Sequence, residues 1–469
     1  MDKSEIFCSI VNIANKDKFI NIKNVLMNSK EVKGGDLFVA IRGGNDFANE
    51  ALKKGAYVVY DNKDIKIEDE FIKRAFLVED SITFLQEFAR KWRKNLNISV
   101  VGITGSNGKT TVKDMVYSLL SREYKGKKTE GNYNNHIGLP FTLLRSEKDD
   151  KFMILEMGMS GFGEIDLLGS ISSPDISVIT NIGESHLEYL KTKENVFKAK
   201  TEILPHTGKV LVLNGNDSYL KNIEDRNFKL VKVLNNGGND FTVSPSDIYY
   251  GDIDFNEEGT TFSLAYSDKD GKESISTYKT NVLGEHNILN LSIAIAVARE
   301  FGISDDSIRE TVKNILLTDM RFQKISKGNI TYINDAYNAS PMSMEKSLET
   351  FSNIYNDREK IAVLGDMLEL GEKERELHAN LFNIIEKSKI DKIYLYGERM
   401  AALYERLTEN SKAESMAGKE VEYFSDKAEI RKRLSHIKAE KAVLIKASRG
   451  IKLEEVIEEG QFFLKSEGK

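Results

Sequence analysis

The sequence predicts an α/β fold of three domains, which we place at residues 1–97, 98–317 and 318–469. From residue 98 onward a β-branched strand, a glycine-rich loop and a helix with an apolar face follow one another, which favours a central domain with a mainly parallel sheet. After residue 330 short apolar strands alternate with helical stretches, as in a Rossmann-like, doubly wound sheet. The residues before 98 form a smaller α/β unit with strands of its own.

The composition excludes several classes of protein. The chain has 469 residues, 40% of them hydrophobic, and a net charge of −6, so it offers no basic surface for nucleic acid. No apolar run approaches the roughly 18 residues of a membrane span, and the charged N-terminus lacks the layout of a signal peptide. Cys8 is the only cysteine, which excludes an internal disulfide. We expect a cytoplasmic monomer that binds no nucleic acid and does not insert stably into a membrane.

The first domain is predicted from three short apolar strands, at residues 36–41, 56–60 and 75–78. A helix follows, and its apolar face carries Phe84, Phe88 and Trp92. A unit of this kind in front of a larger domain is most often a substrate-recognition module, and a purely structural cap is the alternative.

The loop Gly102–Thr111 carries the strongest functional signal. Its glycines allow consecutive backbone N–H groups to turn toward one anion, and the start of the following helix adds partial positive charge. Lys109 can neutralise phosphate oxygens and Thr110 can ligate Mg²⁺. The pattern departs from the common one at Ile103, where a first glycine usually stands. The alternative, an ordinary turn with a surface lysine, explains less of the pattern, and we expect a P-loop ATPase-like domain that binds a nucleoside triphosphate. The predicted phosphate-binding residues are Thr104, Gly105, Ser106, Asn107, Gly108, Lys109, Thr110 and Thr111.

Two chemistry-bearing residues follow neighbouring strands of this domain. Glu156 ends the apolar strand at residues 152–156, where a Mg²⁺ ligand beside a phosphate loop belongs. The alternative is a strand-terminal glutamate in solvent. His186 follows the strand at residues 176–180 and could serve a metal or a phosphate, although a lone histidine in a loop often has no special role.

Three further segments of the central domain are ambiguous from their residues alone. Asn132, Asn134 and Asn135 suit a polyhydroxylated or diphosphate-bearing ligand, and a capped turn is the alternative. Residues 198–203 are typical of a solvated helical face. Asn287 and Asn290, at the start of an apolar helix, could hold a nucleobase edge, or His286 or Asn287 could cap that helix. Between them, residues 241–280 predict an antiparallel meander with a hairpin turn at Asp270-Gly271.

The third domain places polar segments after its predicted strands at residues 330–333, 361–364, 393–396 and 442–445. The polar segments are residues 334–341, 365–372 and 446–450. Because ligands of open α/β sheets bind beyond the carboxyl ends of the strands, this clustering indicates a binding site. The residues contain no Gly-x-Ser-x-Gly elbow and no dinucleotide fingerprint, which leaves metal-assisted phosphoryl transfer. Whether water, a hydroxyl or a carboxylate accepts the phosphate stays open at this point.

The motifs in their order resemble those of the ATP-dependent Mur ligases. The segments that carry the resemblance are Gly105–Thr111, Asn132–Pro140, Glu156–Gly158, His186, Lys200–Ile203, Gly284–Asn290, Asp335–Pro341, Leu364–Glu372 and Lys446–Arg449. Within that family they look most like the member that joins D-alanyl-D-alanine to UDP-N-acetylmuramoyl-tripeptide. The resemblance implies that ATP phosphorylates the tripeptide carboxylate and that the dipeptide amine then attacks the acyl phosphate. Alternatives are a sister ligase that adds the third peptide residue, whose Asp-Asn-Pro-Arg-like signature is missing here, or a non-catalytic ATP-binding scaffold.

The resemblance also implies roles for single residues. Lys109 and the Gly105–Gly108 backbone would hold the phosphates of ATP, Thr110 and Glu156 would ligate Mg²⁺, and His186 would help to place a second Mg²⁺. Lys200 matches a lysine that is carbamylated in these ligases and then becomes a metal ligand, which contradicts the solvated face that the local pattern favours. The implied nucleotide contacts are Asn287 and Asn290 for adenine, Arg321 near the phosphates and Asp335 for ribose. The implied substrate contacts are Ser29 in a UDP-sugar-binding N-terminal domain, and Asn132, Asn134, Asn135, Asn338 and Ser340.

The sequence departs from the family pattern at four places. Asn28-Ser29-Lys30 stands where the family has Asp-Ser-Arg, and Asn334-Asp335 where it has two aspartates. Met320 precedes the hinge arginine in place of glycine, and Ala447 replaces a glycine of the last motif.

Overall fold

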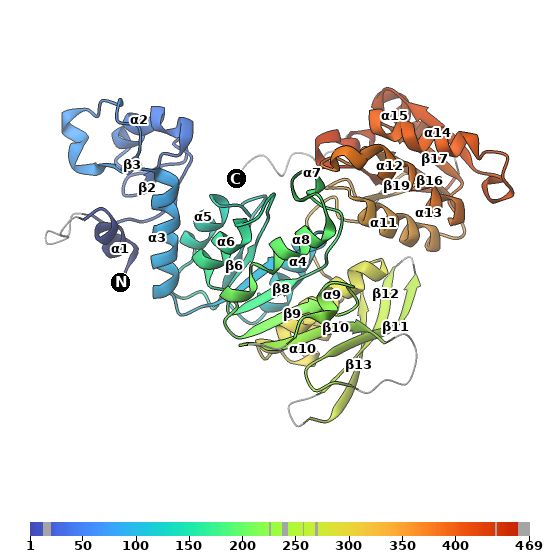
Figure 1. Ribbon diagram of the computed structural model, residues 1–469, viewed down its shortest axis with the longest axis horizontal. Coiled ribbons are helices and arrows are strands. Elements are labelled where there is room, and N and C mark those ends of the chain that lie inside the picture. The colour runs from blue at the N-terminus through green and yellow to red at the C-terminus, as the bar shows by residue number, and fades with distance from the viewer. Residues whose placement is uncertain are drawn as a thin grey trace.

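The computed structural model describes residues 1–12, 20–224, 227–236, 243–256, 258–267, 271–436 and 439–457. In this part of the chain the strands form three sheets, of four, nine and six strands. Figure 1 shows them as three separate units along the chain, coloured blue, green to yellow, and orange to red. The predicted three-domain α/β class is therefore confirmed. None of the helices in the described ranges has the length and apolar character needed to cross a membrane.

The N-terminal unit is a small parallel sheet in the order β1-β2-β3-β4. Its helices and strands are α1 (Lys3–Ile10), β1 (Val25–Leu26), β2 (Leu37–Val39), α2 (Ala48–Lys53), β3 (Tyr57–Tyr60), β4 (Ala75–Leu77) and α3 (Ser81–Asn95). The Asp80 side chain caps α3 by accepting a hydrogen bond from Thr83 N, which satisfies an otherwise unpaired donor of the first turn. The apolar face of α3 joins this unit to the central one, where Trp92 Nε1 donates to Ser146 Oγ at 3.0 Å.

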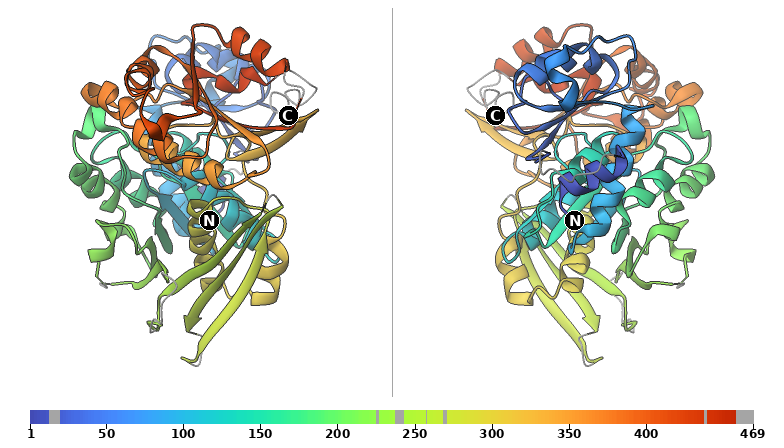
Figure 2. Two further views of the ribbon diagram at one scale, coloured as in Figure 1. Left: turned by 90° about the vertical axis from the view of Figure 1, so that its right-hand side faces the viewer. Right: turned by 90° about the vertical axis from the view of Figure 1, so that its left-hand side faces the viewer.

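The central sheet has the order β13-β12-β11-β10-β9-β8-β5-β7-β6. Neighbouring strands from β6 to β11 pair in parallel, and β11, β12 and β13 form the predicted antiparallel meander. Of the predicted hairpin turn, Asp270 lies outside the described residues. The meander extends away from the other two units (Figure 2). The elements are β5 (Ser99–Thr104), α4 (Lys109–Leu120), β6 (Gly126–Lys128), α5 (Gly138–Leu144), β7 (Phe152–Glu156), α6 (Glu164–Ser172), β8 (Ile176–Ile179), α7 (Leu187–Leu190), α8 (Lys193–Thr201), β9 (Val210–Asn214), β10 (Lys229–Asn235), β11 (Ile248–Asn256), β12 (Gly259–Ser267), β13 (Glu273–Thr280), α9 (Glu285–Glu300) and α10 (Asp305–Val312).

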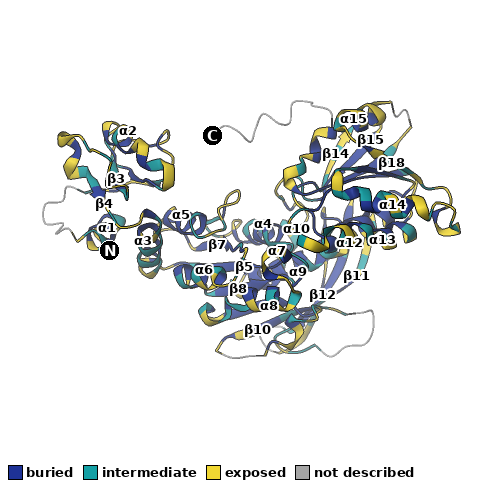
Figure 3. Ribbon diagram, turned by 45° about the horizontal axis from the view of Figure 1, so that its top comes forward, coloured by how far each residue is buried: buried dark blue, intermediate teal, exposed yellow. Residues whose placement is uncertain are grey.

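Both faces of the central sheet are covered, which explains why its strands are apolar throughout. Alternate residues of β5 point to opposite faces, so Val100 joins the core under α3, α5, α6 and α8, while Val101 joins the core under α4, α9 and α10. Figure 3 shows the strands as buried and the outer sides of the helices as exposed. The carboxyl ends of β5, β7 and β8 therefore open at one edge, where the phosphate loop lies.

The C-terminal sheet has the order β14-β15-β19-β16-β17-β18, with only β14 antiparallel among the described strands. One face packs on α11, α13 and α14 and the other on α15, so the expected doubly wound arrangement is confirmed. The elements are β14 (Gln323–Lys327), β15 (Ile330–Asn334), α11 (Pro341–Asn353), β16 (Glu359–Gly365), α12 (Glu374–Ala379), α13 (Phe382–Lys387), β17 (Lys392–Tyr396), α14 (Ala401–Glu409), β18 (Glu420–Phe424), α15 (Lys427–Ser435) and β19 (Lys441–Lys446).

Candidate active site

A cleft of about 1190 Å³ lies between the central and C-terminal units. The loop after β5 and the ends of β7 and β8 line one wall, and the segments after β15, β16 and β19 line the other. Most of the predicted site residues line this cleft: Ser106, Asn107, Gly108, Lys109, Thr110, Thr111, Asn132, Asn134, Asn135, Glu156, His186, Asn287, Asn290, Arg321, Asp335, Asn338 and Ser340. Four predicted residues are not among those that line the cleft: Thr104 ends β5, Gly105 follows it in the loop, Lys200 lies on α8, and Ser29 belongs to the N-terminal unit.

The phosphate loop joins β5 to α4 in a form that requires its glycines. Gly105 has φ +148° and Gly108 has φ +80°, and a Cβ on Gly105 would lie 1.8 Å from Thr180 Oγ1. A Cβ on Gly108 would lie 2.7 Å from Asn290 Oδ1, so Asn290 packs directly against the loop. Lys109 Nζ donates to Gly105 O at 2.7 Å. Burial lowers the pKa of the Lys109 ammonium, and Glu156 opposes that shift.

Glu156 is the centre of a buried polar cluster. It is 4% exposed, so the alternative of a glutamate in solvent is wrong. Thr110 Oγ1 donates to Glu156 Oε2 at 2.9 Å and Asn134 Nδ2 donates to Oε1 at 3.0 Å. Burial opposes ionisation, but Lys113 and Lys109 outweigh it and hold the pKa of the Glu156 carboxyl below its usual value. An ionised carboxylate thus touches the hydroxyl of the predicted Mg²⁺-ligating threonine.

Lys113 and Asp114, one turn along α4, are functional candidates that the sequence reasoning missed. Lys113 is 2% exposed, and its Nζ lies 3.5 Å from Glu156 Oε2 and 3.8 Å from Asp114 Oδ1. Asp114 Oδ2 in turn accepts hydrogen bonds from the N and Oγ1 of Thr318, at 2.9 and 2.6 Å, in the segment that leads to the C-terminal unit. Only the spacing of Lys113 from Lys109 on one helix face could have suggested these contacts.

His186 reaches across the cleft. Its Nδ1 lies 3.2 Å from Glu369 Oε2, and Glu369 follows β16 in the C-terminal unit. The hydrogen bond from His186 holds the pKa of Glu369 below its usual value. This contact joins two segments that the sequence suggested separately.

Lys200 corrects the prediction of a solvated helical face. Its side chain is 1% exposed, whereas Lys198 on the same helix is 60% exposed. Among the residues that the structure describes, Lys200 Nζ has neither a hydrogen bond nor an ion pair. Burial, with a smaller contribution from the charge of Lys109, lowers the pKa of Lys200 well below its usual value.

The hinge between the two units is held by contacts to Arg321 and Phe322. The Arg321 guanidinium lies over the Tyr337 ring at 4.1 Å, and its buried Nε has no hydrogen-bond partner in the described part of the chain. Asp335 accepts hydrogen bonds from Phe322 N at 3.1 Å and from Lys446 Nζ at 2.6 Å. Met320 and Phe322 both have φ near +60°, at 61° and 54°, so the backbone is strained on either side of Arg321.

Three of the other predicted side chains, Asn135, Asn287 and Ser340, form hydrogen bonds within the protein. Asn135 Oδ1 accepts from Gly138 N at 2.9 Å, which fits the capped-turn alternative for that residue. Asn287 Nδ2 donates to Leu283 O at 2.9 Å, and Ser340 Oγ donates to Asn107 Oδ1 at 3.0 Å.

The backbone of Asn338 also has a partner, since its O accepts a hydrogen bond from Lys446 Nζ at 3.2 Å.

The start of α9 differs from the prediction. Gly284 is the N-cap residue and no side chain caps the helix, so the predicted cap by His286 or Asn287 is wrong.

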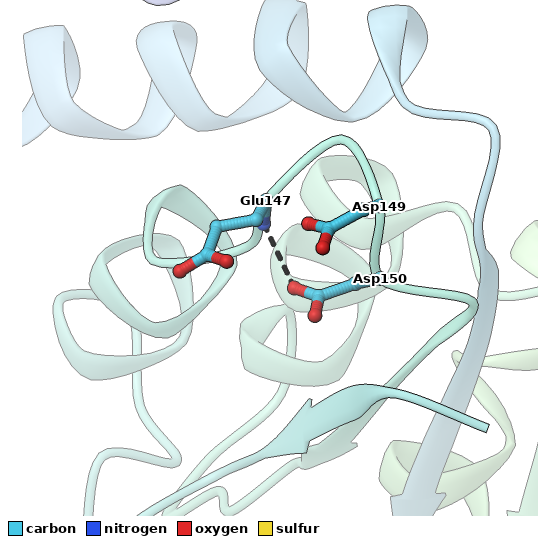
Figure 4. A group of neighbouring side chains, drawn as sticks. All are labelled: Glu147, Asp149 and Asp150. Carbon is cyan, nitrogen blue, oxygen red and sulfur yellow. Dashed lines mark hydrogen bonds between the residues drawn. The ribbon is translucent and has the colours of Figure 1, made fainter. Parts of the chain in front are cut away.

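A second group of carboxylates, Glu147, Asp149 and Asp150, lies on the loop between α5 and β7 (Figure 4). Lys125 Nζ pairs with both Glu147 and Asp149 at 2.7 Å, and Lys127 Nζ pairs with Glu147 at 2.7 Å. Lysines therefore already balance the two exposed carboxylates, Glu147 and Asp149, and we assign no ligand to the group.

Comparison with known proteins agrees with this geometry. Residues 103–298 match the model of the Mur ligase middle domain, and residues 320–449 match that of the Mur ligase, glutamate ligase domain. The UDP-N-acetylmuramoyl-tripeptide–D-alanyl-D-alanine ligase of Bacillus subtilis (strain 168) is 34% identical over 93% of this chain and 93% of its own length. The MurF ligase from Thermotoga maritima, solved in complex with ADP, is 30% identical, with a TM-score of 0.78 over 94% of this chain and 97% of its own. MurF from Acinetobacter baumannii is 24% identical and shares the fold with a TM-score of 0.80 over 97% of each chain. With both family domains and a relative of this similarity along nearly its whole length, the chain belongs to the Mur ligase family.

Proposed function

We propose that this protein is an ATP-dependent ligase that joins D-alanyl-D-alanine to the tripeptide carboxylate of UDP-N-acetylmuramoyl-tripeptide, a step in peptidoglycan precursor synthesis. The observation that carries the proposal is the cleft in which the phosphate loop faces the C-terminal domain, with Lys109 and Glu156 side by side. The names of the relatives that match along nearly the whole chain support the substrates. Residues 1–97 would bind the UDP-sugar, residues 98–317 ATP, and residues 318–469 would close over both.

The chemistry follows from the poor reactivity of a free carboxylate toward an amine. A tripeptide carboxylate oxygen attacks the γ-phosphorus of ATP, ADP leaves, and an acyl phosphate forms. The dipeptide amine then attacks the carbonyl carbon, the tetrahedral intermediate collapses, and phosphate leaves with the bonding electrons as the amine loses its proton. Lys109 and the loop N–H groups would stabilise the charge on the transferred phosphoryl group.

The residues beside the loop suit Mg²⁺. Hard oxygen donors are what this ion prefers, and Thr110 and Glu156 already touch each other in a buried, ionised cluster. Mg²⁺ held there would neutralise charge on the phosphates of ATP. Asn134 keeps the Glu156 carboxylate oriented through its other oxygen.

A second Mg²⁺ would use His186 and Lys200. A histidine that ligates a metal commonly donates its other ring N–H to a carboxylate, and Glu369 stands at the Nδ1 of His186 in that way. The lowered pKa of Lys200 favours the neutral amine, which can add to carbon dioxide and release a proton to give a carbamate. The product is an oxygen anion, which is a metal ligand that an ammonium group cannot be.

The other predicted contacts complete the proposal. Adenine would lie by Asn287 and Asn290, ribose by Asp335 and the phosphates by Arg321. Asn290 and Asp335 also serve the protein itself, since Asn290 packs on Gly108 and Asp335 binds Lys446. A cytoplasmic location and a monomeric state belong to the proposal and can be checked by fractionation and by light scattering.

Phosphate release tests the function. The enzyme is supplied with ATP, Mg²⁺ and UDP-N-acetylmuramoyl-tripeptide, with and without D-alanyl-D-alanine. We expect steady release only with the dipeptide, together with the UDP-muramoyl-pentapeptide in the mass spectrum. Phosphate release at the same rate without the dipeptide, or a product that carries a single amino acid in place of the dipeptide, would overturn the proposal. Parallel assays with tripeptides ending in lysine and in diaminopimelate would define the substrate further.

A further inference from the structure

Glu369 is the acidic side chain by which the C-terminal domain reaches the central domain at His186. Its Oε2 lies 3.2 Å from His186 Nδ1, yet the side chain is 61% exposed and lines the cleft. Lys109 of the phosphate loop lines the same cleft. A carboxylate that faces the phosphates of ATP is unfavourable unless a cation stands between them.

The loop that carries Glu369 is fixed in a strained conformation. Glu369 has φ +64°, which L residues with long side chains rarely adopt. The two residues before it are both held: Met367 N donates to Nε2 of the buried His378 at 2.9 Å, and Leu368 N donates to Ser448 Oγ at 3.0 Å. Backbone strain that the surroundings hold in place is a mark of functional positions.

A guanidinium stands on the neighbouring loop. Strand β19 pairs with β16, so the segment Ala447–Gly450 runs beside the loop that carries Glu369. A Cβ on Gly450 would lie 3.1 Å from Leu368 Cδ1, which shows how closely the two loops approach. Arg449 in this segment lines the same cleft with 54% of its side chain exposed, and its Nη1 contacts Glu454.

We propose that these two loops form the receptor for D-alanyl-D-alanine, with Glu369 binding its ammonium group and Arg449 its carboxylate. The inference rests on the proposed function and names the residues for its second substrate. A dipeptide zwitterion presents one charge of each sign, and the cleft wall offers the opposite charge for each on adjacent loops. The ammonium group at Glu369 would stand beside the phosphate loop, where the acyl phosphate forms, and would add a positive charge there beside the Mg²⁺ proposed at His186.

The test separates dipeptide binding from the first half-reaction. In Glu369→Gln, the acyl phosphate is trapped as a hydroxamate with hydroxylamine in the absence of dipeptide, and KM for D-alanyl-D-alanine is measured separately. Loss of a charge-assisted contact should raise this KM about tenfold or more. The glutamine can still accept the hydrogen bond from His186, so hydroxamate formation should fall by a smaller factor than the dipeptide KM rises. Glu372→Gln, an exposed neighbour, is the matched control and should leave both quantities unchanged.

Two results would overturn the role of Glu369. An unchanged KM for the dipeptide would remove it from the receptor. If hydroxamate formation fell by the same factor as the dipeptide KM rose, and its response to Mg²⁺ weakened, Glu369 would be only a support for His186.

Arg449 is tested with the C-terminal amide of the dipeptide. Wild type should prefer the acid to the amide by about tenfold, and Arg449→Gln should abolish the preference. A preference that survives in the variant would assign the carboxylate to another residue. Phosphate release by the wild-type enzyme, measured alongside, tests the ligase function by itself. Release that does not require the dipeptide would contradict the ligase function. Dipeptide-dependent release by wild type, with variants whose KM and acid preference equal those of wild type, would contradict only the proposed dipeptide site.

Discussion

The helices α4 and α8 each bury one lysine. The lysine on α4 is paired with carboxylates, whereas the lysine on α8 is not. On α4, Lys113 lies 3.5 Å from Glu156 and 3.8 Å from Asp114, so its ammonium group is balanced by two carboxylates. On α8, Lys200 is equally buried but has no anion near it within the described ranges of the chain. The same side chain thus occurs once as half of an ion-pair cluster and once alone.

The difference indicates different tasks. A buried charge is tolerated when it is paired, because the partner offsets the loss of hydration. Burial without a charged partner favours the neutral amine of a lysine, which is the reactive form. We therefore propose that Lys113 keeps Glu156 ionised and in place, and that Lys200 is the lysine converted into a carbamate.

The substitution Lys200→Ala should have the largest effect. If the carbamate ligates a metal, its loss should lower kcat/KM at least about 100-fold. Short carboxylic acids added to the assay should restore part of the activity, because they can occupy the place of the missing anion. Steady-state phosphate release is the measurement.

Lys198→Ala is the matched control for this variant. Lys198 lies on the same helix but is exposed and pairs only loosely with Glu194, at 3.8 Å. Its activity should equal that of wild type. Full activity of Lys200→Ala would break the contrast between the two helices.

The substitution Lys113→Met should act on stability first. It leaves Glu156 and Asp114 buried without their shared cation, which should reduce the free energy of unfolding by about 3 kcal/mol. Added Mg²⁺ with an ATP analogue should recover part of the loss, because a bound cation beside Glu156 replaces the missing charge. Scanning calorimetry with and without the ligands measures both effects.

Lys128→Met is the control for Lys113→Met. Lys128 pairs with Asp114 at 2.7 Å but keeps 29% of its side chain exposed, so its removal should reduce the free energy of unfolding by only about 1 kcal/mol. If both variants had the same free energy of unfolding, the burial of Lys113 would not increase its contribution to stability.

His286 offers a third buried base and a pH test. Its Nδ1 is covered and has no hydrogen-bond partner among the described residues, and burial lowers the pKa of its ring from 6.5 to about 4. The unfolded chain therefore binds one proton more than the folded chain between these two pH values, so stability falls as pH drops through that window. We expect the free energy of unfolding to fall by about 2 kcal/mol on this account, a moderate figure because His286 is only partly buried.

The variant His286→Gln should flatten the wild-type dependence between pH 6.5 and 4. Denaturant titrations of both proteins across the window are the measurement. An unchanged slope in the variant would show that other groups govern it.

The smallest effect is expected for Tyr337, which holds a cation by its ring and not by a carboxylate. Removing the ring in Tyr337→Leu frees Arg321 and should lower kcat about threefold to tenfold. Tyr337→Phe keeps the ring face and should match wild type. A defect in the phenylalanine variant would point to the hydroxyl group instead.

The sequence was sufficient for features that local patterns encode. Continuous apolar runs such as residues 152–156 and the glycine-rich pattern Gly105–Thr111 are written in neighbouring residues. The parallel sheets and the succession of strand, glycine-rich loop and helix were therefore predicted correctly, and phosphate binding by the loop stays a prediction. The short or amphipathic strands β1, β6, β10, β14 and β18 were missed, because edge strands such as β1 and β14 and half-exposed ones such as β10 lack a continuous apolar run.

Features that depend on tertiary packing could not be predicted from local patterns. Lys198 and Lys200 look alike in sequence, and only the packing of α8 against the central sheet buries one of them. Glu156 contacts Lys113, which lies 43 positions earlier in the sequence, and His186 contacts Glu369, which lies 183 positions later. Gly284 begins α9 with φ +95°, where the residue types favoured His286 or Asn287 as the cap.

The central claim, that an unpaired buried lysine marks a site of covalent conversion, is tested most directly by nuclear magnetic resonance with isotopically labelled bicarbonate. The wild-type enzyme should show a carbamate carbon signal that Lys113→Met retains and Lys200→Ala lacks. Absence of that signal in wild-type enzyme that is fully active under the same conditions would contradict the account.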